Sequence, residues 1–156
     1  MDETSVAVPI NDEVKSLLFF NKLSVIILTH KTEKKKTSST KGMQTSVRTS
    51  KLINSRLQNT YKTCIDLIKS IKNQNHEQFF EVIMRESNNF HAICQDSYPP
   101  LLYLNDFSRW IINLIHEFND NTLKCGYTFD AGPYPVIFVL NDKKKEFIKI
   151  ITQQKE

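Results

Sequence analysis

The chain has 156 residues, of which 40% are hydrophobic and 24% are charged, and its formal net charge is +4. This length suits one domain and leaves little room for two, so a single domain over residues 1–156 is expected. Three glycines and five prolines argue against a loop-rich or disordered chain. No apolar run approaches the ~20 residues that a membrane span needs, and the acidic start Met1-Asp2-Glu3 lacks a secretory pattern. A cytoplasmic (cytosolic) protein is the expectation.

The cysteines and basic runs do not indicate a disulfide framework or a metal site. Cys64, Cys94 and Cys125 are an odd number at wide spacing without a CxxC pair, so reduced, buried thiols are expected. Lysine runs at 34–36 and 143–145 supply much of the net charge and are typical of solvated segments, although the first adjoins a polar motif. The aromatic residues lie at helical spacing typical of a core, so nucleic-acid binding is not expected.

The first half of the chain predicts two strands followed by helices. Weak alternation at 5–10 and β-branched residues at 22–29 indicate short strands. Ser38 and Ser39 offer helix N-cap oxygens, and Gly42 lets the backbone approach a ligand closely. Apolar residues then recur every three or four positions, as in an amphipathic helix. The expected helices are 43–50 and 51–72.

The second half predicts two helices, two strands and a last helix. Tyr98-Pro99-Pro100 ends the helix at 77–95, because proline cannot donate to a helix. Asn105 or Asp106 can cap the next helix, which contains Trp110. The period then changes to that of strands. The remaining elements are strands at 125–129 and 135–140 and a helix at 144–153. The whole order indicates an α+β domain, with helices packed on an antiparallel sheet of about four strands.

The run Tyr-Thr-Phe-Asp-Ala-Gly-Pro at 127–133 is the strongest candidate for a functional site. Asp130 lies where a strand runs into a tight turn, so its carboxylate can face a ligand while the strand fixes its backbone. The alternative is that Asp130 bonds nearby turn amides, as aspartates in turns often do. Spacing alone leaves both interpretations open.

Two weaker candidates precede it. Residues 37–43 gather four hydroxyls beside lysines at a helix start, which suits phosphate binding, although an ordinary helix cap has the same pattern. It is no Walker A loop, because the first glycine and the GK[ST] ending are missing. His91 is interpreted as a buried, hydrogen-bonded structural residue, since its spacing to His76 and His116 suggests no metal site. No Ser–His–Asp order or Cys–His pairing supports hydrolase chemistry.

Taken together, these segments resemble the mevalonate diphosphate decarboxylase family of the GHMP kinase superfamily. The matching motifs are a strand at 22–30, Ser-Ser-Thr-Lys-Gly-Met at 38–43, Glu-Ser-Asn-Asn-Phe-His-Ala-Ile-Cys at 86–94, Ser-Tyr-Pro-Pro at 97–100 and Tyr-Thr-Phe-Asp-Ala-Gly-Pro at 127–133. They stand in the family's order and spacing, and the resemblance covers about residues 5–151. Several motifs in register are a stronger signal than any one of them.

The resemblance implies the fold of a GHMP kinase C-terminal domain and an ATP- and Mg²⁺-dependent lyase of isoprenoid and sterol biosynthesis. The family phosphorylates the tertiary hydroxyl of mevalonate 5-diphosphate, then loses phosphate and carbon dioxide to give isopentenyl diphosphate. Its motif aspartate contacts that hydroxyl, which makes Asp130 the expected catalytic residue. Ser39, Thr40 and Met43 match substrate-binding positions, with Thr40 at the diphosphate. A homodimer is also implied.

The sequence departs from the family in two ways. Tyr134 and Pro135 replace the usual Asn and small residue, which puts the shape of the turn after Asp130 in doubt. The family is also more than twice as long, and its phosphate loop and its carboxylate-facing arginine have no match here. The chain therefore resembles a C-terminal segment with little turnover alone. The alternatives are a noncatalytic remnant that acts as a dimerisation or interaction module and, less favoured, a related small-molecule kinase.

Overall fold

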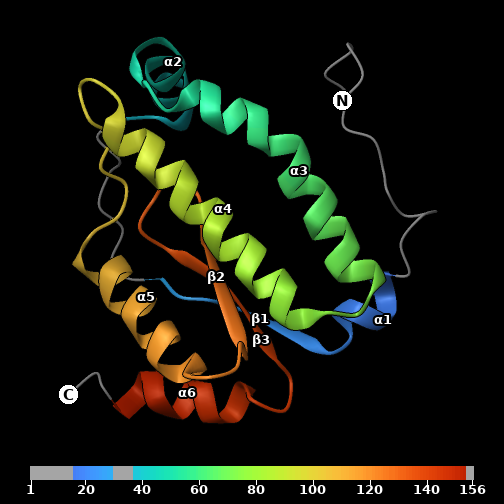
Figure 1. Cartoon of the computed structure of the whole chain (residues 1–156). Helices are drawn as coiled ribbons and strands as arrows, with labels where there is room; N and C mark the ends of the chain where they lie inside the picture. The colour runs from blue at the N-terminus through green and yellow to red at the C-terminus, as the bar shows by residue number, and fades with distance from the viewer. Residues whose placement is uncertain (1–15, 30–36, 154–156) are drawn as a thin grey trace.

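The computed structural model describes residues 16–29 and 37–153, and shows helices packed on a three-stranded antiparallel sheet (Figure 1). The long helices α3 and α4 run side by side as a hairpin. In the same view α5 lies to the left of the sheet and α6 lies below it. The elements are α1 (Ser16–Phe20), β1 (Leu23–Ile27), α2 (Ser39–Thr49), α3 (Ile53–Lys72), α4 (His76–Asp96), α5 (Asp106–Asn119), β2 (Cys125–Phe129), β3 (Pro135–Leu140) and α6 (Lys144–Gln153).

The sheet confirms the predicted α+β class, but its described part holds three strands where about four were expected. The expected strand at residues 5–10 lies outside the described residues. The order is β1-β3-β2, so β3 is central and pairs antiparallel with both neighbours. Its residues alternate between buried and half-buried, as a strand covered more on one face requires. Ile137 pairs with Ile26 on one side and Tyr127 on the other.

Most helix boundaries lie within two residues of the predicted ones, but α2 begins at Ser39, four residues before the predicted start at 43. Ser38 caps α2 by accepting the Lys41 N–H at 3.3 Å. Of the two predicted N-cap candidates, Asn105 and Asp106, it is Asn105 that caps α5, where it forms a capping box with Ser108. Helix α1 was not predicted: its Phe19 is fully buried and stacks on His76 at a ring distance of 4.2 Å.

The core joins the sheet to α4, α5 and α6, and it brings α4 very close to β2. A Cβ on Gly126 would lie 3.1 Å from the Cα of Phe80, so a larger residue here would require α4 and β2 to shift by a few tenths of an ångström. All three cysteines are free. Cys94 and Cys125 are buried as predicted, but Cys64 is exposed on α3, where the prediction of burial was wrong. Burial raises the pKa of Cys125 to about 12, so its thiol stays protonated.

Candidate active site

Hydrogen bonds to backbone carbonyl oxygens hold the turn after β2, and the Asp130 carboxylate takes no part in them. The Gly132 N–H donates to the Asp130 carbonyl oxygen at 2.6 Å, and Ser108 Oγ of α5 donates to the Pro133 carbonyl oxygen at 2.8 Å. The Asp130 side chain is exposed, and within residues 16–29 and 37–153 its carboxylate has no hydrogen-bond or ion-pair partner. Among the described residues, the Asp130 carboxylate therefore does not bond the turn amides, which was the alternative interpretation from the sequence.

The unusual Pro135 is compatible with this turn. It is buried and begins β3 opposite Phe129, and the first residue of a strand is a position that proline tolerates. Its carbonyl oxygen accepts the Leu28 N–H at 3.4 Å. The Tyr-Pro departure from the family pattern therefore leaves the strand pairing on both sides of Asp130 intact.

Two side chains of α4 contact Phe129, the residue before Asp130. Ser87 Oγ accepts the Phe129 N–H at 3.0 Å, and both residues are buried. One turn further along α4, the His91 ring packs edge-on against the Phe129 ring at 6.2 Å. Burial lowers the pKa of His91, while a hydrogen bond with the Phe129 backbone and the charge of Asp130 act in the opposite direction. His91 is thus buried, as the sequence predicted, but its Nε2 has no hydrogen-bond partner among the described residues.

Tyr103, in the segment between α4 and α5, links this region to α2. Its ring lies 6.4 Å from the His91 ring, and its hydroxyl oxygen occupies the space where a Cβ of Gly42 would be. The hydroxyl is buried, and the described residues offer it no hydrogen-bond partner. Burial raises the pKa of Tyr103, and the charges of Cys94 and Asp130 add to this effect. Gly42 therefore makes room for a tyrosine, not for the ligand that the sequence suggested.

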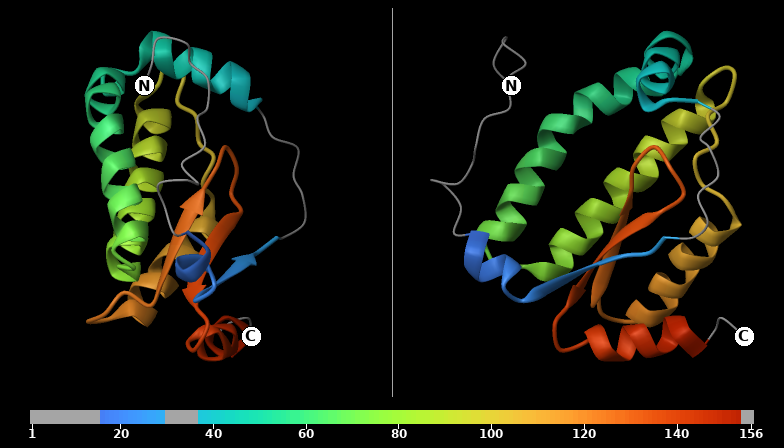
Figure 2. Two further views of the ribbon diagram at one scale, coloured as in Figure 1. Left: turned by 90° about the vertical axis from the view of Figure 1, so that its right-hand side faces the viewer. Right: turned by 180° about the vertical axis from the view of Figure 1, so that it is seen from behind.

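The other predicted site residues lie on the first two turns of α2. Ser39, Thr40 and Met43 are all exposed. In both views of Figure 2, the β2–β3 turn lies at the same end of the molecule as α2. The first N–H groups of a helix have no intrahelical partner and favour anions, and the α2 first turn carries no acidic residue. The structure thus brings a free carboxylate and a phosphate-compatible helix start to one end of the fold.

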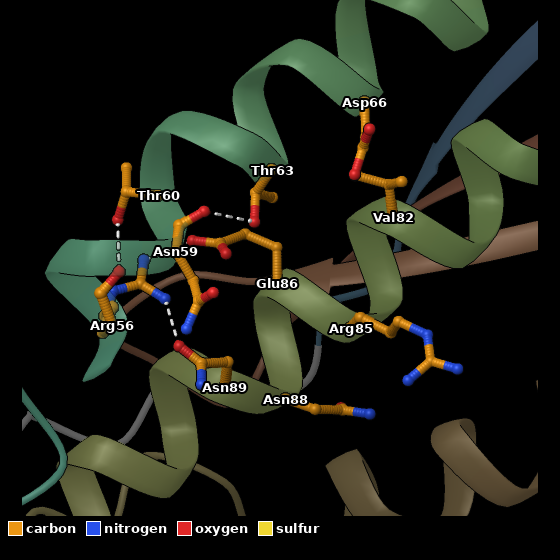
Figure 3. Close-up of a pocket in the computed structure, with 10 residues that line it drawn as sticks. All are labelled: Arg56, Asn59, Thr60, Thr63, Asp66, Val82, Arg85, Glu86, Asn88 and Asn89. Carbon is orange, nitrogen blue, oxygen red and sulfur yellow. Dashed lines mark hydrogen bonds and ion pairs between the residues drawn. The ribbon is translucent and has the colours of Figure 1, made fainter. Parts of the chain in front are cut away.

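A cavity of about 440 Å³ lies between α3 and α4 (Figure 3). Arg56 contacts the Glu86 carboxylate and donates to Asn89 Oδ1 at 2.8 Å, so its charge is already paired. Opposite charges offset one another in this cavity, and Asp130 and α2 do not line it. It is lined by Arg56, Asn59, Thr60, Thr63, Asp66, Val82, Arg85, Glu86, Asn88 and Asn89.

Three residues that hold the site were not singled out from the sequence: Ser87, Tyr103 and Ser108. The i, i+4 spacing of Ser87 and His91 on a helix was a usable signal, because it places both side chains on one face. Tyr103 and Ser108 act across long sequence separations and carry no local signal. In the described part of the chain, no three His, Cys, Asp or Glu side chains could hold a metal ion, and no helix is long and apolar enough to cross a membrane.

Replacement of Gly42 by alanine is expected to lower the free energy of unfolding by about 1–3 kcal/mol, the usual cost of overpacking. The added Cβ would lie 2.1 Å from the Tyr103 hydroxyl oxygen, but 3.4 Å from the ring carbon that bears it. The same change made in a Tyr103→Phe background is expected to stabilise α2 by up to about 1 kcal/mol, because alanine favours helices over glycine. Urea unfolding of the four chains measures this reversal of sign, and equal losses in both backgrounds would contradict it.

The fold and the site together define a C-terminal domain of the GHMP kinase type. Residues 25–155 match the family model described as the mevalonate 5-diphosphate decarboxylase C-terminal domain. The chain is 46% identical over 132 residues to diphosphomevalonate decarboxylase of Rattus norvegicus, and 41% identical over 145 residues to that of Danio rerio. These alignments cover 83% and 91% of this chain. Mevalonate diphosphate decarboxylase of Staphylococcus aureus superposes with a TM-score of 0.87 at 29% identity, over 100% of this chain and 46% of that one.

The chain belongs to the mevalonate 5-diphosphate decarboxylase family, as a match to its C-terminal domain. It spans about a third of the length of the curated relatives, 33% of the rat protein and 36% of the zebrafish protein. The resemblance expected from the motifs is confirmed over nearly all of the described chain.

Proposed function

We propose that this chain supplies Asp130 and the residues around it to one side of an active site. That active site decarboxylates mevalonate 5-diphosphate to isopentenyl diphosphate in an ATP-dependent reaction. The observation that carries the proposal is the exposed Asp130 carboxylate, which has no partner in the described structure, while α4 and α5 hold the backbone of Phe129 and Pro133 on either side of it. A carboxylate placed in this way on a rigid strand end suits a catalytic base. The family to which the chain belongs performs this reaction.

In the proposed reaction, the Asp130 carboxylate accepts the proton of the substrate's tertiary hydroxyl while that oxygen takes the γ-phosphoryl group of ATP. Phosphate then leaves with its C–O bond electrons, and loss of carbon dioxide supplies the electrons of the new double bond. Phosphoryl transfer depends mainly on positioning and electrostatics, so a fixed carboxylate contributes directly. Thr40 and Ser39 would hold the diphosphate through their hydroxyls and the free N–H groups of α2. Met43, exposed one turn further along, would contact the substrate from the same helix.

ATP as cosubstrate and Mg²⁺ as metal belong to the proposal, as the family resemblance implies. A solved neighbour with a TM-score of 0.81, 23% identical, is described as being in complex with MVAPP, AMPPCP and magnesium, which are ligands of that protein. The described residues of this chain form no acidic cluster that would hold Mg²⁺. We propose that ATP and Mg²⁺ bind in the complete active site, to which this segment contributes. A cytosolic homodimer, as the resemblance implies, completes the proposal.

Binding of mevalonate 5-diphosphate to the purified 156 residues tests the proposal directly. A retained half-site is expected to give a ligand-dependent rise in melting temperature, because a ligand that binds the folded state stabilises it. Ser39→Ala with Thr40→Ala should abolish the rise, whereas Ser55→Ala, an exposed serine on α3, should not. Absence of any rise, with stable self-association in size-exclusion chromatography with mass detection, would favour the interaction module instead. In an assay of ADP release, little or no turnover is expected from these residues alone.

A further inference from the structure

Two side chains of α4 hold the peptide that leads into Asp130. Ser87 and His91 are four residues apart and therefore share a helix face. Ser87 is 3% exposed and accepts the Phe129 N–H, and His91 is 9% exposed and packs against the Phe129 ring. Phe129 itself is 4% exposed, so its position is fixed by the core on one side and by α4 on the other. The next residue along the chain is Asp130.

An imidazole is an unexpected side chain for a residue whose only role would be to fill space in the core. Its ring lies among the rings of Phe90, Tyr103 and Phe129, at centroid distances of 4.9, 6.4 and 6.2 Å. Its Nε2 is buried without a hydrogen-bond partner in the described structure. A buried polar atom without a partner destabilises the fold, so an aromatic residue without nitrogen would serve packing better. What the imidazole adds at this position is a pair of ring nitrogens beside Phe129, whose N–H is already bonded to Ser87 Oγ.

We propose that His91 is a positioning residue, which acts with Ser87 on the Phe129 peptide to fix the direction of the Asp130 carboxylate. The inference rests on the proposed role of Asp130 as the base. A side chain at the end of a strand swings with the peptide before it, and a misplacement of about 1 Å can cost 100-fold in rate. Ser87 accepts the Phe129 N–H and His91 packs against the Phe129 ring, so the two side chains hold one residue and act as a pair.

The experiment uses a chimera, in which residues 25–155 of this chain replace the matching segment of the rat enzyme. His91→Phe keeps the ring but removes both nitrogens. We expect its kcat to fall roughly 10- to 100-fold, while KM for mevalonate 5-diphosphate stays within about twofold because the proposed phosphate contacts lie on α2. Ser87→Ala should lower kcat in the same way. The double variant should lose much less than the product of the two single losses, because both side chains hold one peptide.

His76→Phe is the matched control. His76 is the first residue of the same helix, three turns before Ser87, and it stacks on Phe19 and contacts the Phe19 carbonyl oxygen through Nε2 at 3.2 Å. His76→Phe therefore also loses a ring-to-backbone contact, and the kcat of this variant should not change. Thermal unfolding of each chimera variant distinguishes loss of the folded state from misplacement of the carboxylate, since all assays are run well below the measured Tm.

His91→Asn and His91→Gln complete the test, because each places an amide near one of the two ring-nitrogen positions. One of them is expected to recover most of the lost kcat. Unchanged kcat in His91→Phe would overturn the inference, as would a loss that neither amide restores or a loss shared by His76→Phe. If Asp130→Asn also keeps its turnover, the proposed function itself is wrong. If Asp130→Asn is inactive and His91→Phe is fully active, only the positioning role is wrong.

Discussion

Asp130→Asn, made in the chimera with the rat enzyme, is expected to lower kcat by about 10²-fold or more. The amide keeps the size and shape of the side chain but cannot accept a proton at neutral pH. Because the carboxylate has no partner in the described structure, its replacement removes no structural hydrogen bond. The melting temperature should therefore stay close to that of the unsubstituted protein, and the loss should fall on the chemical step.

Steady-state release of ADP, measured at saturating ATP, provides the rate. Asp142→Asn is the matched control, since Asp142 is also an exposed turn aspartate but lies after the opposite end of β3. Its kcat should match that of the unsubstituted chimera. Turnover of Asp130→Asn within a fewfold of the control would remove Asp130 from the mechanism and leave the turn with a structural role.

Asn119→Ala is expected to lower the free energy of unfolding by about 3–5 kcal/mol, because several buried backbone groups lose their partner at once. Asn119 is 2% exposed. Its Oδ1 accepts the N–H groups of Lys124 and Cys125 at 2.9 and 3.1 Å, and its Nδ2 donates to the Cys125 carbonyl oxygen at 2.9 Å. One side chain thus joins the end of α5 to the first residue of β2. The far end of that strand carries Asp130.

Urea unfolding of the 156-residue chain measures this loss, with the slope of the transition used to confirm that the folded state stays compact. Asn121→Ala is the control, because Asn121 is exposed and its side chain bonds only Asp120 in the described structure. Its effect should stay within about 0.5 kcal/mol. A loss below 1 kcal/mol for Asn119→Ala would show that water replaces the three bonds and that β2 does not depend on this anchor.

The local parts of the fold were predictable because their signals are local. The last helix begins and ends at the predicted residues, and β2 and β3 have the predicted bounds, since a change of hydrophobic period marks them. Cap chemistry placed the start of α5 to within one residue. Helix α1 escaped prediction, because five residues are too few to show a period and its position depends on burial of Phe19.

The sequence by itself determined the α+β class, the family motifs and Asp130 as the residue to test. It left open whether Asp130 was an ordinary turn aspartate, because that depends on which groups fill its surroundings. Only the tertiary structure shows those surroundings: Ser108 and Gly132 bond the backbone of the turn, Ser87 and His91 contact Phe129, and the described residues offer the Asp130 carboxylate no hydrogen-bond partner. The catalytic role of Asp130 stays a prediction. These contacts join residues up to 42 positions apart. A local pattern carries no information about such partners, and the packing of α4 and α5 on β2 brings them together.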